Sequence, residues 1–202
     1  AVAHSSSPYI TTYDWDGTEW VKRPNPASLP TGDGNGVALT HDGTVMAVAH
    51  DGSPYITTYD WDGTEWVKRP DPTSLPSNNA NGVALTHDGT VMAVAHSSSP
   101  CITTYDWVEG AWVKRPDPTS LPTGTGNGVA LTPDGTVMAV AYWNSPHIIT
   151  YDWDGTAWVK RPGPSVLPTF SGNGVALTPD GAVMAVAHSS SPYITTYDWD
   201  GT

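Results

Sequence analysis

The sequence repeats itself every 46 residues, and this period restricts the chain to a small set of architectures. The segment Thr-Tyr-Asp-Trp begins at positions 12, 58, 104, 150 and 196, and the first two repeats differ at only 8 positions. A fixed period of this length indicates one supersecondary unit copied in tandem, each copy burying its apolar face against its neighbours. We therefore expect residues 1–202 to form one continuous array. It has four repeats and a partial fifth: 1–46, 47–92, 93–138, 139–184 and 185–202.

Each repeat has the pattern of four short strands. In the stretch 81–116, a strand of small residues at 81–86 leads through an Asp-Gly turn to an apolar strand at 91–96. An alternating strand at 102–107 and a last strand at 112–116 follow. Such turns between period-two segments are typical of β-hairpins. The sequence therefore predicts an all-β fold, a β-propeller of four-stranded antiparallel blades with 46 residues per blade. A solenoid of stacked β-coils is the competing architecture.

Residues 131–141, Leu-Thr-Pro-Asp-Gly-Thr-Val-Met-Ala-Val-Ala, resemble the strand-turn-strand motif of WD40-like and lactonase-type β-propellers. The resemblance extends along the whole chain and implies the fold, not an activity. The terminal Trp-Asp of true WD40 repeats is absent, because Trp15 and Asp16 precede the turn between the third and fourth strands. The near-identical repeats are also similar to those of phage and microbial surface proteins. That similarity implies an extracellular or virion-surface location.

The charge of the chain disfavours several classes of partner. The net charge is −12, and an acidic surface repels the phosphate backbone, so we expect no nucleic-acid partner. No apolar run approaches the length that spans a bilayer, so we expect no membrane span. The single cysteine, Cys101, stands where other repeats have Tyr or His, so we interpret it as a drifted repeat position. We expect no cofactor, no metal and no catalytic residue.

The differences between repeats concentrate in two loops. We label the strands a to d from the inside out; the b–c and d–a loops then emerge at the same end of a propeller, where recognition residues often lie on a rigid scaffold. The fourth repeat places two aromatic residues there, and aromatic rings beside amides suit the faces of sugars. Drift in exposed loops is the alternative explanation. The candidate ligand-binding residues are Trp143, Asn144, His147, Phe170, Asp51, His50 and Asn79.

Three sets of repeated polar residues suggest metal or turn chemistry. Histidines recur at the end of strand b (His4, His50, His96 and His188), and asparagines recur where strand a begins (Asn35, Asn81, Asn127 and Asn173). Aspartate pairs such as Asp14 and Asp16 have a spacing that can bind Ca²⁺ but is also ordinary in turns. We expect the histidines to be hydrogen-bonded within the fold and the asparagines to satisfy turns.

The sequence therefore favours a non-enzymatic binding or structural module that presents these loops to a carbohydrate or protein ligand. A protein–protein interaction scaffold is the alternative, and a lactonase-like hydrolase is the second. Enzymes need some repeats to depart from symmetry with acid, base or nucleophilic residues, and the departures here are mostly Trp, Phe, Cys and Val.

Two further expectations concern packing. The second tryptophan of each pair, such as Trp66, should pack between sheets. A ring needs a whole number of blades, and the first 18 residues recur as residues 185–202. We therefore expect further blades of a longer polypeptide, giving six to eight in all, or association of copies, to complete the ring.

Overall fold

The computed structural model describes residues 1–201, and their regular secondary structure consists entirely of β-strands. Three complete blades lie in the middle of the chain, each a four-stranded antiparallel sheet in the order a, b, c, d. The second blade contains β5 (Gly34–Leu39), β6 (Val45–His50), β7 (Ile56–Trp61) and β8 (Trp66–Lys68). The third contains β9 (Ala80–Leu85), β10 (Val91–His96), β11 (Ile102–Val108) and β12 (Ala111–Lys114). The fourth contains β13 (Gly126–Leu131), β14 (Val137–Tyr142), β15 (Ile148–Trp153) and β16 (Trp158–Lys160).

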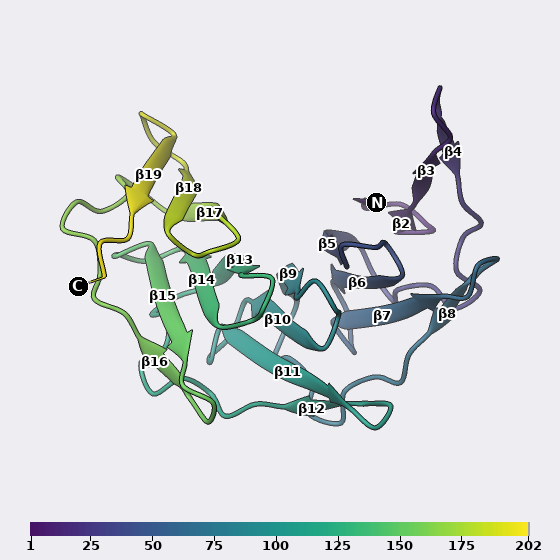
Figure 1. Ribbon diagram of the computed structural model, residues 1–202, viewed down its shortest axis with the longest axis horizontal. Coiled ribbons are helices and arrows are strands. Elements are labelled where there is room, and N and C mark those ends of the chain that lie inside the picture. The colour runs from purple at the N-terminus through teal and green to yellow at the C-terminus, as the bar shows by residue number, and fades with distance from the viewer. Residues whose placement is uncertain (202) are drawn as a thin grey trace.

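The first and last blades are partial within the described residues. The first contains β1 (Val2–Ala3), β2 (Ile10–Thr11), β3 (Tyr13–Trp15) and β4 (Trp20–Lys22), as two separate two-stranded sheets. The last contains β17 (Gly172–Leu177), β18 (Val183–His188) and β19 (Ile194–Asp198) in one three-stranded sheet. The blades follow one another along an arc with the strand-a elements on its inner side (Figure 1). The predicted fold, a propeller of four-stranded blades with a 46-residue spacing, is confirmed.

Local sequence explains each hairpin. Between strands a and b of the second blade, Thr40 Oγ1 donates to Asp42 Oδ1 at 2.7 Å, and Gly43 takes the left-handed backbone (φ 70°) that the turn requires. The turn leads into β6, Val-Met-Ala-Val-Ala-His, whose residues are all buried because sheets pack on both of its faces. The same turn and buried strand recur in the third and fourth blades.

Small residues let the inner strands lie close together. A Cβ placed on Gly82 would lie 3.2 Å from the Cα of Gly128 in the next blade. Asparagine side chains then link these strands, since Asn81 Nδ2 donates to the Gly126 carbonyl at 2.8 Å, and Asn35 and Asn127 make the equivalent bonds. The prediction that the asparagines satisfy turns is wrong for these three, because their amides reach across to the neighbouring blade. Asn173 Nδ2 donates instead to Ser189 Oγ of its own blade at 3.0 Å.

Strand d fills the space between blades with an indole ring. Trp66, Trp112 and Trp158 are almost completely buried, which confirms the prediction for these residues. Each indole Nε1 donates to a threonine on strand c of the preceding blade; Trp66 does so to Thr12 at 2.9 Å. In the first blade, by contrast, Trp20 is 67% exposed, because the described residues place no blade before it.

An arginine that follows strand d clamps each blade to the next. Arg69 forms an ion pair with Asp60 of its own blade at 2.7 Å, and its guanidinium lies 4.2 Å from the Trp107 ring centroid of the following blade. Arg23, Arg115 and Arg161 repeat both contacts. The Asp14-type carboxylates therefore bind arginine and the Asp16-type carboxylates accept hydrogen bonds within their own turn, so the two do not act as a pair of Ca²⁺ ligands.

Candidate ligand-binding face

The two variable loops of each blade lie together, as the sequence predicts. In the second blade, Thr31 Oγ1 of the d–a loop donates to the Ser53 carbonyl of the b–c loop at 2.9 Å, and Asp51 N donates to the Asp33 carbonyl at 3.0 Å. The third, fourth and last blades repeat this hydroxyl-to-carbonyl bond. Because both loops are fastened to each other, they present their side chains from a fixed backbone.

Two aromatic rings stack at the junction of the fourth and last blades, and the exposed Trp143 lies on the same loop as one of them. Trp143 and His147 belong to the b–c loop of the fourth blade, and Phe170 belongs to the d–a loop that leads into the last blade. The rings of His147 and Phe170 stack with centroids 6.3 Å apart at 24°. Trp143 is 58% exposed and Phe170 is 50% exposed. We call Trp143, His147 and Phe170 the aromatic patch.

Hydrogen bonds hold the backbone beneath the aromatic patch. The Trp143 carbonyl accepts from Ser171 Oγ at 3.0 Å and lies 3.0 Å from His147 Nδ1. Asn144 Nδ2 donates to the Thr123 carbonyl at 2.8 Å. His147 itself has a left-handed backbone (φ 71°), which non-glycine residues adopt only where the surroundings enforce it. The patch is therefore a preformed surface with polar groups of Asn144 and His147 at its edge.

The remaining candidate residues lie at another junction, between the second and third blades. Asn79 Oδ1 accepts from the Gly52 amide at 3.4 Å, and Asp51 Oδ1 accepts from Asn35 Nδ2 at 2.9 Å. Asp51 and Asn79 are both partly exposed. The structure thus separates the seven candidates into two groups on different blades and does not bring them into one site.

His50 is fully buried, so a ligand at the surface has no access to its imidazole. Its Nε2 hydrogen-bonds Thr57 Oγ1 at 2.9 Å, and burial lowers the pKa of the ring. His4, His96 and His188 make the same bond to a threonine seven residues later. This confirms that the repeated histidines are hydrogen-bonded within the fold.

No group of three or more His, Cys, Asp or Glu side chains in residues 1–201 is arranged to hold a metal ion. Cys101 is buried, and burial raises the pKa of its thiol. Residues 1–201 contain no membrane-spanning helix.

Sequence reasoning missed the residues that join the blades. Within one repeat, the position of Arg69 suggests an edge residue and that of Asn81 suggests a turn residue. In the structure both side chains contact the next blade. A usable signal existed for the arginine: an aspartate lies nine residues before it in all four complete repeats, which is the spacing of partners across the c–d hairpin.

Comparisons with known proteins support the fold. No protein-family model matches the chain, and no curated protein matches it. Among solved structures, hydrazine synthase of Kuenenia stuttgartiensis matches 92% of this chain with 16% identity and a TM-score of 0.63. A chain of the mitotic checkpoint complex matches 88% with 14% identity and a TM-score of 0.67. A putative 6-phosphogluconolactonase from Bacteroides uniformis matches 95% with 13% identity and a TM-score of 0.66.

These matches cover 49%, 52% and 60% of the other chains, so this chain spans about half the length of the first two proteins that it resembles. At such low identity the likeness extends to the backbone and not to the residues of a site. The resemblance of residues 131–141 to propeller motifs is therefore borne out at the level of the fold. The chain is an array of β-propeller blades.

Proposed function

We propose that the chain is a non-enzymatic binding module and that the aromatic patch binds a glycan on a microbial or virion surface. The observation that carries this proposal is the presence of two exposed rings, Trp143 and Phe170, on the loops of one blade junction, at positions where the other blades have small or polar residues. Sugar rings have apolar faces of C–H groups that pack on aromatic rings, while their hydroxyls hydrogen-bond amides and imidazoles.

The local chemistry supports this assignment. Stacking against Phe170 fixes the ring of His147, and the bond between Asn144 Nδ2 and the Thr123 carbonyl fixes that amide, so the polar groups lose little freedom on binding. Trp143 and Phe170 face solvent, and such an exposed surface suits weak recognition of one or two sugar units. Avidity from several such surfaces would then determine the strength of attachment.

The repeats themselves supply variants that test the proposal. At the position of Trp143 the first, third and last blades have serine, and at the position of Phe170 the first and third loops have glycine. The double substitution Trp143→Ser and Phe170→Gly therefore copies loops that this fold already contains. We expect the unaltered chain to bind specific neutral glycans on an array and the double variant to lose that binding.

The control is Trp15→Ala, which removes an exposed ring at the opposite end of a blade. Equal loss of binding in this control would indicate non-specific adsorption to tryptophan and contradict the glycan site. Binding of a protein from the source surface, with no glycan bound, would instead favour the interaction scaffold. That alternative has some support, since one similar fold occurs in the mitotic checkpoint complex.

A further inference from the structure

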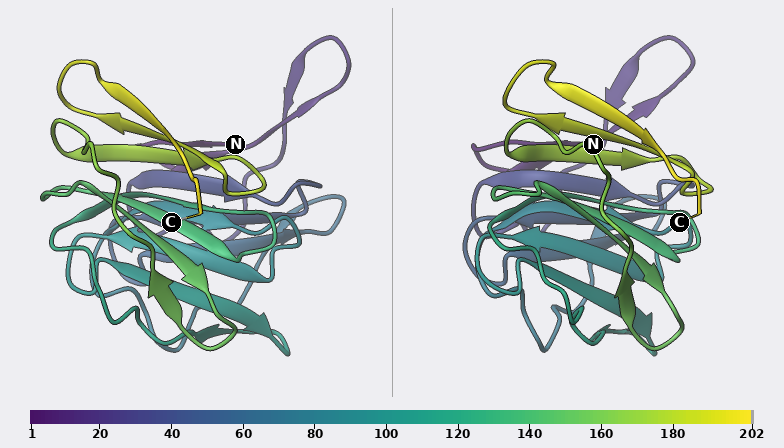
Figure 2. Two further views of the ribbon diagram at one scale, coloured as in Figure 1. Left: turned by 60° about the vertical axis from the view of Figure 1, so that its left-hand side comes forward. Right: turned by 90° about the vertical axis from the view of Figure 1, so that its left-hand side faces the viewer.

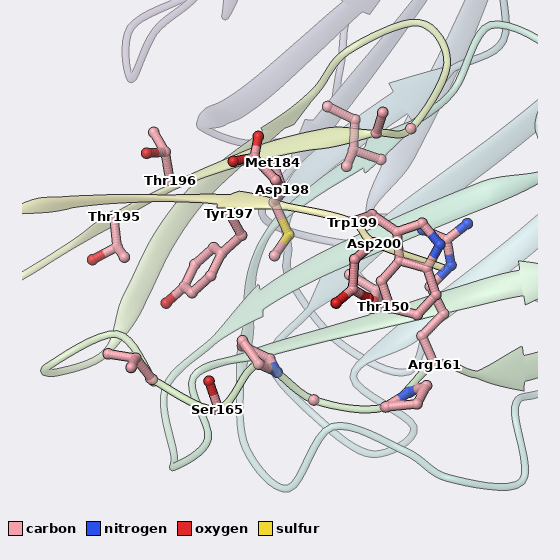
Figure 3. Close-up of a pocket in the computed structure, with 17 residues that line it drawn as sticks. Thr150, Arg161, Ser165, Met184, Thr195, Thr196, Tyr197, Asp198, Trp199 and Asp200 are labelled. Carbon is pink, nitrogen blue, oxygen red and sulfur yellow. The ribbon is translucent and has the colours of Figure 1, made fainter. Parts of the chain in front are cut away.

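A hollow of about 630 Å³ lies between the fourth blade and the last blade, and none of the aromatic patch residues lines it (Figure 3). Side chains of both blades line it, including Thr150, Arg161, Met184, Tyr197 and Trp199. In Figure 3 the Tyr197 and Met184 side chains point into this space. We call it the socket, because the same position between the other blades is filled.

Three filled copies of the socket show what belongs in it. Between each earlier pair of blades, the indole of strand d enters and its Nε1 donates to a strand-c threonine. The donor–acceptor pairs are Trp66 to Thr12, Trp112 to Thr58 and Trp158 to Thr104, at 2.9, 2.8 and 2.9 Å. The next threonine in this series is Thr150. It lines the socket and is only half-buried, whereas its three counterparts are buried.

Of two contacts that recur at the filled interfaces, the socket has the arginine contact but lacks the tyrosine contact. Arg161 lies 4.4 Å from the Trp199 ring centroid, so the clamp between the two blades is made. The tyrosine contact is not: Tyr59, Tyr105 and Tyr151 each donate to the carbonyl of a serine 31 residues earlier. Tyr197 makes no such bond to Val166 within the described residues, and Val166 is 70% exposed.

The outer edge of the last blade specifies a strand. In the third blade, β12 pairs with β11 so that Trp112 lies opposite Trp107 and Lys114 opposite Tyr105, and Arg115 then binds Asp106. The corresponding residues of β19 and its continuation are Tyr197, Asp198 and Trp199. In residues 1–201 no strand pairs with this edge of β19. An incoming Trp-Val-Lys-Arg segment would therefore meet an apolar socket and an acidic Asp198 in the register that the chain already uses.

The other end of the array holds a strand d whose tryptophan lacks a socket. Trp20 is 67% exposed in the described structure, while its counterpart Trp66 is 2% exposed. The β3–β4 hairpin projects away from the blades (Figures 1 and 2). The sequence around it, Trp-Val-Lys-Arg-Pro, is the one that fills the three internal sockets.

We propose that the socket binds β4 and Arg23 from a second copy of this chain, so that two copies form one ring. Trp20 Nε1 of one copy donates to Thr150 Oγ1 of the other, Arg23 pairs with Asp198, and β4 becomes strand d of the last blade. Each copy supplies one socket and one such strand, so the contact is heterologous and two of them close a dimer. Residues 1–202 contain four whole repeats, so two copies of these residues give an eight-bladed ring, within the range that propellers adopt.

The identical hairpins 1–18 and 185–202 explain how the exchange is possible without a clash. Both carry strands b and c of the same blade position, so β17–β19 can keep its own hairpin while residues 1–18 of the second copy are released. Thr196 then replaces Thr12 as the acceptor for Trp66 of the second copy. Strand exchange between identical elements adds few new contacts that the fold does not already contain. An unpaired sheet edge provides the driving force.

The test is the mass of the 202-residue chain in solution across a concentration series, measured by light scattering. We expect about twice 21.4 kDa for the unaltered chain. Trp20→Ala should raise the dimer dissociation constant at least about thirtyfold, because a buried anchor is lost, with an unchanged circular dichroism spectrum. Thr150→Val should raise it about tenfold, because only the hydrogen bond is removed.

The control is Trp143→Ala, an exposed tryptophan in the aromatic patch, which should leave the mass unchanged. A chain that stays at 21.4 kDa at every soluble concentration would overturn the proposal and leave a further repeat of a longer polypeptide as the occupant. Dimers that survive Trp20→Ala, or a mass other than two copies, would overturn it as well. Loss of the dimer in Trp143→Ala would overturn the socket proposal and would indicate that the aromatic patch is an interface between copies. The result of the glycan-binding experiment does not bear on the socket proposal.

Discussion

A buried histidine and its threonine behave as one unit in this array. His96 Nε2 hydrogen-bonds Thr103 Oγ1 at 2.9 Å, and the same pair occurs in four of the five blades. In the fourth blade both members differ together, because Tyr142 replaces the histidine and Ile149 replaces the threonine. A buried hydroxyl left without its partner destabilises a fold, so losing both at once is the less costly change.

The histidine unit makes stability depend on pH. Burial lowers the pKa of His96 from 6.5 to about 4, and burial also lowers the pKa of His50. The unfolded chain therefore takes up protons between pH 6.5 and 4 that the folded chain does not, so the free energy of unfolding falls as the pH falls through this window. The contribution of His96 is about 3 kcal/mol, present in full above pH 6.5.

We expect the double variant His96→Tyr and Thr103→Ile, which copies the fourth blade, to lose much of this pH dependence while remaining folded. Urea unfolding at pH 7 and at pH 4.5 measures it. Below pH 4 both proteins should lose stability in parallel, because carboxylates such as Asp42 are then protonated in the unfolded chain, whereas hydrogen bonds from Thr40 and Thr44 lower the pKa of Asp42 in the folded protein to about 2. An unchanged difference between the two pH values would exclude His96 as the group responsible.

The interblade tryptophan gives the second prediction at this scale. Trp66→Ala should lower the free energy of unfolding by about 3–5 kcal/mol, since the ring is buried and its Nε1 bond to Thr12 is lost. Trp143→Ala is the matched control and should change it by less than about 0.5 kcal/mol, because that ring is exposed. Urea unfolding of both variants compares them; a loss below about 1 kcal/mol for Trp66 would mean that the blades do not depend on the indole.

At the scale of the element, the strands of a single blade were predictable and the contacts between blades were not. Asp-Gly turns and alternating residues placed the four strands of the third blade to within two residues of β9–β12. Pairing inside a hairpin depends on residues close in sequence, which one repeat displays. The Arg69–Trp107 stack and the Asn81–Gly126 bond join residues 38 and 45 positions apart across a blade boundary, and a repeat read alone does not show which neighbour its side chains face.

The candidate site shows the same division. Variation between copies located the loops and the exposed rings of Trp143 and Phe170, because those positions break the repeat. The variation at Asp51 also led us to include its neighbour His50 as a candidate, although His50 is buried. Composition alone does not separate a residue that varies at the surface from the buried residue next to it.

Inner-strand glycines give the prediction for this scale. Gly128→Ala should lower the free energy of unfolding by about 1–3 kcal/mol, because its Cβ would lie 3.0 Å from the Gly174 Cα and 3.1 Å from the Asn173 carbonyl oxygen. Gly174→Ala is the matched control: no atom lies within 4 Å of its Cβ in the described structure. Thermal unfolding in dilute solution compares them. Equal losses would show that strand propensity, not the contact between inner strands, determines the effect.

For the whole molecule, the distribution of charge restricts the ligand. The four arginines are held by aspartates and tryptophan rings between blades, and Lys68 and Lys114 pair with Asp71 and Asp117. The net charge of −12 therefore acts at the surface with little basic charge to bind an anion.

We accordingly expect neutral sugars to bind in preference to sulfated or sialylated ones. On a glycan array at physiological salt, anionic glycans should give weaker signals than their uncharged parents. Raising the salt concentration should reduce that difference, since screening weakens the repulsion. Preferential binding of sulfated glycans would contradict this view of the surface.

The arginine clamp also gives the array a direction. All four guanidinium groups reach forward to the tryptophan of the following blade, and the indoles of Trp66, Trp112 and Trp158 reach back to a threonine of the preceding one. The two ends of the arc therefore differ chemically: one exposes strand d and the other exposes the socket. Two copies can associate only by placing the first kind of end against the second. A short peptide with the sequence of β4 would then compete with the second copy for the socket and would leave the β4 end of the chain unoccupied.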